Sequence, residues 1–123
     1  MKIHPLNLFL RLLLELMVLF FAIEWALQAY EGWERYVLMI VMPVLIATLW
    51  GVFNVPGDPS RSGKAVVAIP GWLRLILELL IFSSGAWFIS ESGYIRASWL
   101  FAAIVILHYV LSFSRIRWLI KGS

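Results

Sequence analysis

The chain is dominated by long apolar runs that are interrupted by glycine, proline and a few charged residues. Four of these runs reach the roughly 20 residues that a helix needs to cross the ~30 Å hydrocarbon layer of a membrane. They predict helices over about 6–30, 36–55, 72–90 and 97–120, and the proline- and glycine-containing connector 56–71 is expected to be irregular. The pattern therefore predicts an all-α membrane protein, with four transmembrane helices in a single domain over residues 1–123.

Composition agrees with this prediction. Hydrophobic residues make up 63% of the chain and charged residues 14%, against roughly 45–50% and 25% in an ordinary soluble domain. The lipid bilayer is therefore the expected environment of most side chains. Cysteine is absent, which excludes disulfides, thiolate nucleophiles and cysteine-ligated metals.

The positions of basic residues predict the orientation, because lysine and arginine in short loops resist translocation. The termini, the connector and the residues next to them carry Lys2, Arg61, Lys64, Arg74, Arg115, Arg117 and Lys121. The two other turns carry only Arg35 and Arg96. Both termini and the connector are therefore expected to be cytoplasmic. The formal net charge of +3 then indicates attraction to anionic lipid headgroups at that face, and no nucleic-acid partner is expected.

Two similar stretches, RLLLEL at 11–16 and RLILEL at 74–79, lie early in the first and third apolar runs. An offset of 63 residues aligns Arg11 with Arg74 and Glu15 with Glu78. Such self-similarity indicates two parallel helix-hairpin repeats, related by an axis along the membrane normal. Chance similarity between apolar segments is the alternative.

Each repeated stretch places an arginine and a glutamate one helical turn apart on the same face. Charges inside a bilayer cost about 2.5–3.5 kcal/mol each at its centre, so each glutamate needs a positive partner, a proton or water. A neutral cluster results if the first and third helices approach, with Arg11 reaching Glu78 and Arg74 reaching Glu15. We interpret this cluster as a structural network that fixes helix register. The alternative is a binding role, with the arginines holding an anionic headgroup or substrate and a glutamate exchanging a proton.

A second polar stripe is expected in the last helix, where His108, Ser112 and Arg115 follow one another at spacings of four and three residues. This spacing places them on one face, which should point into the helix bundle. A lone intramembrane histidine favours hydrogen bonding over metal binding. We expect no metal, no cofactor and no catalytic residues, because no nucleophile, base and orienting group are found together.

The order of these motifs resembles the YrdB-like family of small bacterial membrane proteins. The resemblance rests on R-x3-E-L in the first helix, LWGVFNVP at 49–56 and PGWLRLILEL at 70–79. Its motif positions are Arg11, Glu15, Trp50, Gly51, Pro56, Arg74 and Glu78. The family has no known function, so the resemblance implies a multi-pass protein of the bacterial inner (cytoplasmic) membrane and transfers no activity.

The leading hypothesis is a non-enzymatic membrane protein with a structural or accessory role. The alternative is a small-molecule or ion transporter that uses the Arg/Glu cluster. Small size, four helices and Glu15 in the first helix also resemble small multidrug-resistance transporters, but the firm charge bias and the long connector depart from them. A homo-oligomer and a membrane-protein partner are both left open.

Overall fold

A computed structural model describes residues 5–58 and 65–121 of the chain. In these ranges the helices are α1 (Pro5–Ala29), α2 (Trp33–Val52), α3 (Gly71–Glu91), α4 (Ile95–Leu111) and α5 (Phe113–Lys121). Two short strands, β1 (Phe53–Asn54) and β2 (Val67–Ala68), complete the structure. The prediction of an all-helical class is confirmed apart from β1 and β2, which pair to form a short ribbon with two residues in each strand.

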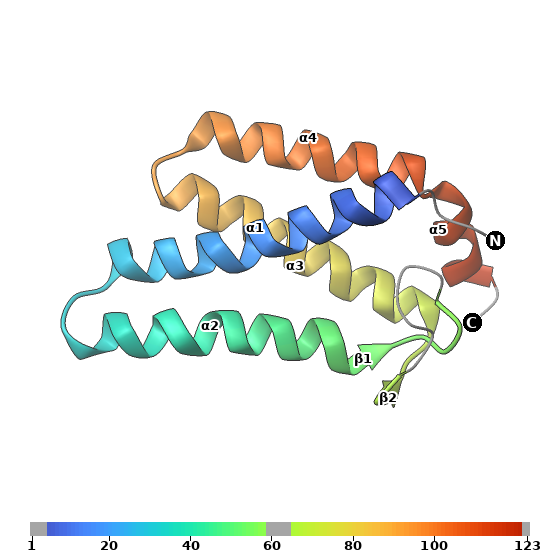
Figure 1. Ribbon diagram of the computed structural model, residues 1–123, viewed down its shortest axis with the longest axis horizontal. Coiled ribbons are helices and arrows are strands. Elements are labelled where there is room, and N and C mark those ends of the chain that lie inside the picture. The colour runs from blue at the N-terminus through green and yellow to red at the C-terminus, as the bar shows by residue number, and fades with distance from the viewer. Residues whose placement is uncertain (1–4, 59–64, 122–123) are drawn as a thin grey trace.

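The helices form two hairpins, α1–α2 and α3–α4, and the first helix of each hairpin packs against the first helix of the other. Helix α1 packs against both α2 and α3, and α4 packs against α3, so α2 and α4 lie on opposite sides of the central α1–α3 pair (Figure 1). The two hairpin turns lie at one end of the molecule, whereas the start of α1, the ribbon and α5 lie at the other end (Figure 1). The duplication of a two-helix unit remains a prediction.

The core lies mainly where α1 and α3 come close together. Val18 and Ala22 of α1 are fully buried, and Gly85 of α3 faces Val18. A Cβ atom added to Gly85 would lie only 2.6 Å from Cγ2 of Val18. A small residue at this position therefore permits the close approach of the two backbones, as small residues do in membrane helix pairs.

The exterior of the molecule is strongly apolar. In α2 only Ile46 and Trp50 are buried, and many large hydrophobic side chains of this helix are exposed. Helices α1, α2 and α3 are each long and apolar enough to cross a membrane, and α4 with α5 would make a fourth span if the bent pair is counted as one. Three or four helices could thus span a bilayer by length and composition.

The fourth predicted helix, 97–120, is not continuous. It is divided at Ser112 into α4 and α5, which are inclined to each other by 69°. The backbone N–H of Ser112 still bonds to the carbonyl of His108, while its carbonyl accepts from the N–H of Arg115 and its side chain is buried. The bend turns the basic α5 segment across the end of the bundle, where Arg115 contacts two buried carboxylates.

The connector also differs from the prediction. Helix α2 ends at Val52 rather than near residue 55, and the side-chain amide of Asn54 donates a 2.6 Å hydrogen bond to the carbonyl of Gly51. β1 then pairs in parallel with β2, in the register Phe53 with Val67. The expectation of an irregular connector is therefore wrong for Val67 and Ala68, because the chain returns to the end of α2 and pairs there with β1.

Candidate functional site

Glu78 of α3 is the centre of a buried charge cluster. Its carboxylate is fully buried and lies 2.7 Å from Nη2 of Arg11, 2.8 Å from Nε of Arg74 and 2.7 Å from Nη2 of Arg115. The hydroxyl of Tyr109 donates a further hydrogen bond of 2.8 Å to Oε1. Because these partners come from α1, α3, α4 and α5, one carboxylate connects four helices.

Arg74 connects the cluster to the end of α2. Its Nη1 donates hydrogen bonds of 2.7 Å to the carbonyl of Trp50 and 2.8 Å to that of Phe53. The last carbonyls of a helix have no partner within the helix, and a cation there also interacts favourably with the helix dipole. The guanidinium carbons of Arg74 and Arg11 lie 4.8 and 4.9 Å from the centroid of the Trp50 ring, within cation–π distance.

Arg115 connects the cluster to the connector. Its Nε and Nη2 donate to the two carboxylate oxygens of Asp58, at 2.8 and 2.6 Å, in the bidentate geometry that suits a guanidinium. Asp58 is 1% exposed. The sequence prediction did not include Asp58, and its only signal is that it stands as the single acidic residue of an otherwise basic connector.

A hydrogen-bonded network around His108 borders the cluster. The side-chain amide of Asn7 donates to the hydroxyl of Ser112. Nδ1 of His108 lies 2.9 Å from Oδ1 of Asn7, and Nε2 lies 3.4 Å from Nη1 of Arg11. These neighbours suit a tautomer in which Nδ1 donates to Asn7 and Nε2 accepts from Arg11. The predicted stripe of His108, Ser112 and Arg115 is buried in the bundle, whereas Asn7, Asp58 and Tyr109 were missed.

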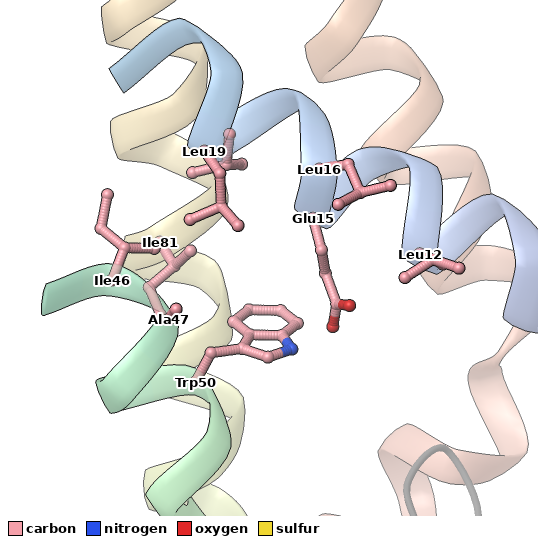
Figure 2. A pocket seen from close by; sticks show the side chains of 9 residues that line it. Leu12, Glu15, Leu16, Leu19, Ile46, Ala47, Trp50 and Ile81 are labelled. Carbon is pink, nitrogen blue, oxygen red and sulfur yellow. The ribbon is translucent and has the colours of Figure 1, made fainter. Parts of the chain in front are cut away.

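Glu15 is placed differently from Glu78, although the sequence treats the two residues as equivalent. The nearest Arg11 nitrogen, Nε, lies 3.7 Å from Oε1 of Glu15, and the side chain of Glu15 is 18% exposed. It faces a pocket of about 240 Å³ between α1 and α2 (Figure 2). The structure thus brings Arg11, Arg74 and Glu78 together and leaves Glu15 at the edge. The contact of Arg74 with Glu15 remains a prediction.

Among residues 5–58 and 65–121, the cluster contains as many arginines as carboxylates. Its described cations are Arg11, Arg74 and Arg115, and its described carboxylates are Glu15, Asp58 and Glu78. Within residues 5–58 and 65–121, no three histidine, aspartate or glutamate side chains are arranged to hold a metal ion. The chemistry that this arrangement supports is ion pairing and hydrogen bonding between helix ends. The absence of a metal or cofactor in the functional protein remains a prediction.

Fold and site together define a small all-helical protein with three or four helices of membrane-spanning length, joined at one end by a buried charge cluster. The chain belongs to the family described as protein of unknown function (DUF2568), which matches residues 9–106. It is 40% identical over 120 residues to the "Uncharacterized protein YrdB" of Bacillus subtilis (strain 168), with 98% of each chain covered. The resemblance to the YrdB-like family is thereby confirmed. No solved structure gives a significant match.

Proposed function

We propose that this chain is a non-enzymatic integral protein of the bacterial cytoplasmic membrane, with a structural or accessory role. In this proposal both termini and the connector are cytoplasmic, and α4 with α5 completes the fourth membrane element. The observation that carries the structural role is the complete burial of Glu78 among three guanidinium groups.

The apolar exterior supports a position within the bilayer. On α2, for example, Tyr36, Ile40 and Val44 are each 58–66% exposed. A soluble monomer rarely exposes contiguous apolar surface of this extent, whereas lipid tails are a suitable environment for it. The ribbon of β1 and β2 and the basic helix α5 lie at the same end of the molecule, which is consistent with the positive-inside rule if that end is cytoplasmic (Figure 1).

The contacts of the cluster favour a structural role over transport. Glu78 is 0% exposed and accepts hydrogen bonds from Arg115 and Tyr109, besides its contacts with Arg11 and Arg74. A transported ion or molecule would need a path to this carboxylate, and the pocket between α1 and α2 is lined by Glu15 and not by Glu78. The partial exposure of Glu15 is the feature that favours the transporter alternative.

Helix α5 supports an interaction with anionic lipid headgroups. One side of it is buried through Arg115 and Leu119, while Phe113 and Ile120 are 56% and 61% exposed. Its remaining charged residues, Arg117 and Lys121, are also exposed. An amphipathic helix with apolar and basic exposed residues suits the membrane interface, where apolar side chains insert and basic side chains meet phosphate groups.

Single cysteines test the membrane topology, because the natural chain contains none. In the proposed orientation, Glu31→Cys and Glu91→Cys react with an impermeant thiol reagent added to intact cells. Val66→Cys and Ser123→Cys react only after the membrane is permeabilised. Labelling of Val66→Cys or Ser123→Cys in intact cells would overturn the orientation, and recovery of the protein in the soluble fraction would overturn the membrane assignment.

A further inference from the structure

Two pockets on one side of the α3–α4 hairpin join into a single groove. One pocket, of about 340 Å³, lies between α3 and α4, and the other, of about 300 Å³, extends to α5. Both are lined by Leu79, Val105 and Ile106, so the two pockets adjoin. Along α3 their lining runs from Leu75 to Ala86 at intervals of three or four residues, which is one face of a helix. The groove therefore follows the helix pair from its middle to α5.

The groove is apolar and open to the exterior. Its polar lining residues are Ser83 and Tyr109, and the hydroxyl of Tyr109 donates to Glu78 inside the bundle. Ile106 and Val110 of the lining are 64% and 63% exposed. In a chain that spans a bilayer, as proposed above, such a groove opens toward the lipid tails. An acyl chain fits it, because lipid tails are as apolar as these side chains.

The length of the groove matches one leaflet of the bilayer. On α4 the lining extends from Ala102 to Val110, a separation that corresponds to about 12 Å along the helix axis. One leaflet contributes half of the ~30 Å hydrocarbon layer, or about 15 Å. The groove is thus long enough for one acyl chain to follow it through most of a leaflet, with the headgroup at the α5 end.

Helix α5 makes this end of the groove cationic. It is inclined by 69° to α4, so it lies close to the plane of the membrane if α4 crosses the bilayer along its normal. Phe113 and Ile116 of α5 line the groove, and the guanidinium carbon of Arg117 lies 5.6 Å from the centroid of the Phe113 ring. Lys121 follows Arg117 by one helical turn, and both side chains are exposed. Two cations on one face of α5 therefore begin where the apolar groove ends.

The charges around α5 favour a headgroup with a phosphate and no ammonium. The carboxylates that contact α5 are those of Asp58 and Glu78, which are 1% and 0% exposed and both pair with Arg115. The exposed charges of α5 are both positive. An anionic lipid is attracted to them, whereas a zwitterionic lipid also brings an ammonium group that they repel. A second copy of the chain would bring two further cations to the same end of the molecule.

We propose that this groove binds one anionic phospholipid. An acyl chain lies between α3 and α4, and the phosphate meets Arg117 and Lys121. The lipid occupies one groove rather than a general belt around the protein, and this assignment rests on the membrane position proposed above.

Two photoreactive phospholipids with the same diazirine-bearing acyl chain test this site. One is a phosphatidylglycerol, which is anionic, and the other is a phosphatidylcholine, which is zwitterionic. Each is irradiated with the purified protein in detergent, and the labelled residues are mapped by mass spectrometry. We expect phosphatidylglycerol to label the groove residues of α3 and α4 at least about fivefold more, the factor for one basic residue near anionic lipid. Excess unlabelled phosphatidylglycerol should remove this labelling.

Matched substitutions test the headgroup and the acyl chain separately. Arg117→Gln should lower the preference for phosphatidylglycerol about fivefold. Arg96→Gln removes an exposed arginine at the other end of α4 and should leave the preference unchanged. Ala102→Phe fills the groove and should abolish the labelling, whereas Ala103→Phe adds the same side chain at an exposed position outside the lining and should retain it.

Equal labelling of the groove by the two lipids, or phosphatidylglycerol labelling spread evenly over α1 to α4, would overturn the proposal. So would an unchanged preference in Arg117→Gln. A dimer that dissociates in Ala102→Phe but not in Ala103→Phe, with the groove unlabelled, would show that a second copy occupies it instead.

The lipid comparison and the competition use the unaltered chain, so they do not depend on whether a variant folds. Recovery of the protein in the soluble fraction would overturn the membrane assignment. A membrane-embedded chain whose groove shows no lipid preference would overturn this site alone.

Discussion

Replacement of Gly85 by alanine tests the close packing of α1 on α3. The added Cβ would lie 2.6 Å from Cγ2 of Val18 and 3.4 Å from the ring of Phe101. Carbon atoms in contact prefer about 3.5–4.0 Å, so the side chain of Val18 or one of the two helices must shift by about 1 Å. Overpacking of this kind costs about 1–3 kcal/mol, whereas the better helix propensity of alanine offsets about 1 kcal/mol of this cost. We expect a net loss of about 0–2 kcal/mol in the free energy of unfolding.

Gly51→Ala is the matched control, since a Cβ atom added to Gly51 has no neighbour within 4 Å. This variant carries the same gain in helix propensity without the clash. Thermal unfolding of both variants in detergent, followed by circular dichroism, should therefore place Gly85→Ala about 1–3 kcal/mol below Gly51→Ala. The double variant Gly85→Ala, Val18→Ala should recover part of the loss, because the opposing methyl group is removed. Equal stability of the two glycine variants would refute the proposed α1–α3 contact.

Two further predictions concern helix α5 and the histidine. Arg115→Gln breaks the bidentate pair with Asp58 and should detach α5 from the bundle. Limited proteolysis should then cut near Ser112 several times faster than in the unaltered chain. An unchanged rate of cleavage would show that other contacts hold α5. Metal analysis of the purified protein should show no stoichiometric transition metal, because His108 is occupied by Asn7 and Arg11; a bound metal that disappears in His108→Ala would contradict this.

Much of the helical architecture could be predicted from the sequence, because membrane-spanning length and apolar composition are local properties. The pairing of Arg11 with Glu78 also followed from the repeated motif and a charge-neutrality argument. The bend at Ser112 could not be predicted, because the segment 97–120 is apolar enough to be read as one span. In the bent arrangement Arg115 contacts carboxylates that are 37 and 57 residues away in the chain, and such distant contacts leave no local pattern in the sequence.

The unequal environments of Glu15 and Glu78 were not predictable either. Both residues follow an arginine at the same spacing, and the local sequences are nearly identical. The difference arises from tertiary neighbours, since Tyr109 and Arg115 of the second half both contact Glu78. Asn7 was missed for a similar reason: a single amide near the chain start has no local pattern that indicates a buried partner.

A double-mutant cycle between Arg11 and Glu78 tests the structural role of the cluster most directly. Without Glu78, Arg74 still contacts the carbonyl of Trp50 and Arg115 still contacts Asp58. Arg11 loses its 2.7 Å ion pair, so it is the arginine most affected. Breaking a buried pair costs about 3–5 kcal/mol, and the alternative contacts of Arg74 and Arg115 favour the lower end for Glu78→Gln.

The free energy of unfolding in detergent is measured for Arg11→Gln, Glu78→Gln and the double variant. The account predicts that each single variant has a clearly lower free energy of unfolding. The loss in the double variant should be smaller than the sum of the two single losses by about 0.5–3 kcal/mol. Additive losses, or single variants as stable as the unaltered chain, would contradict the claim that this buried pair holds α1 to α3.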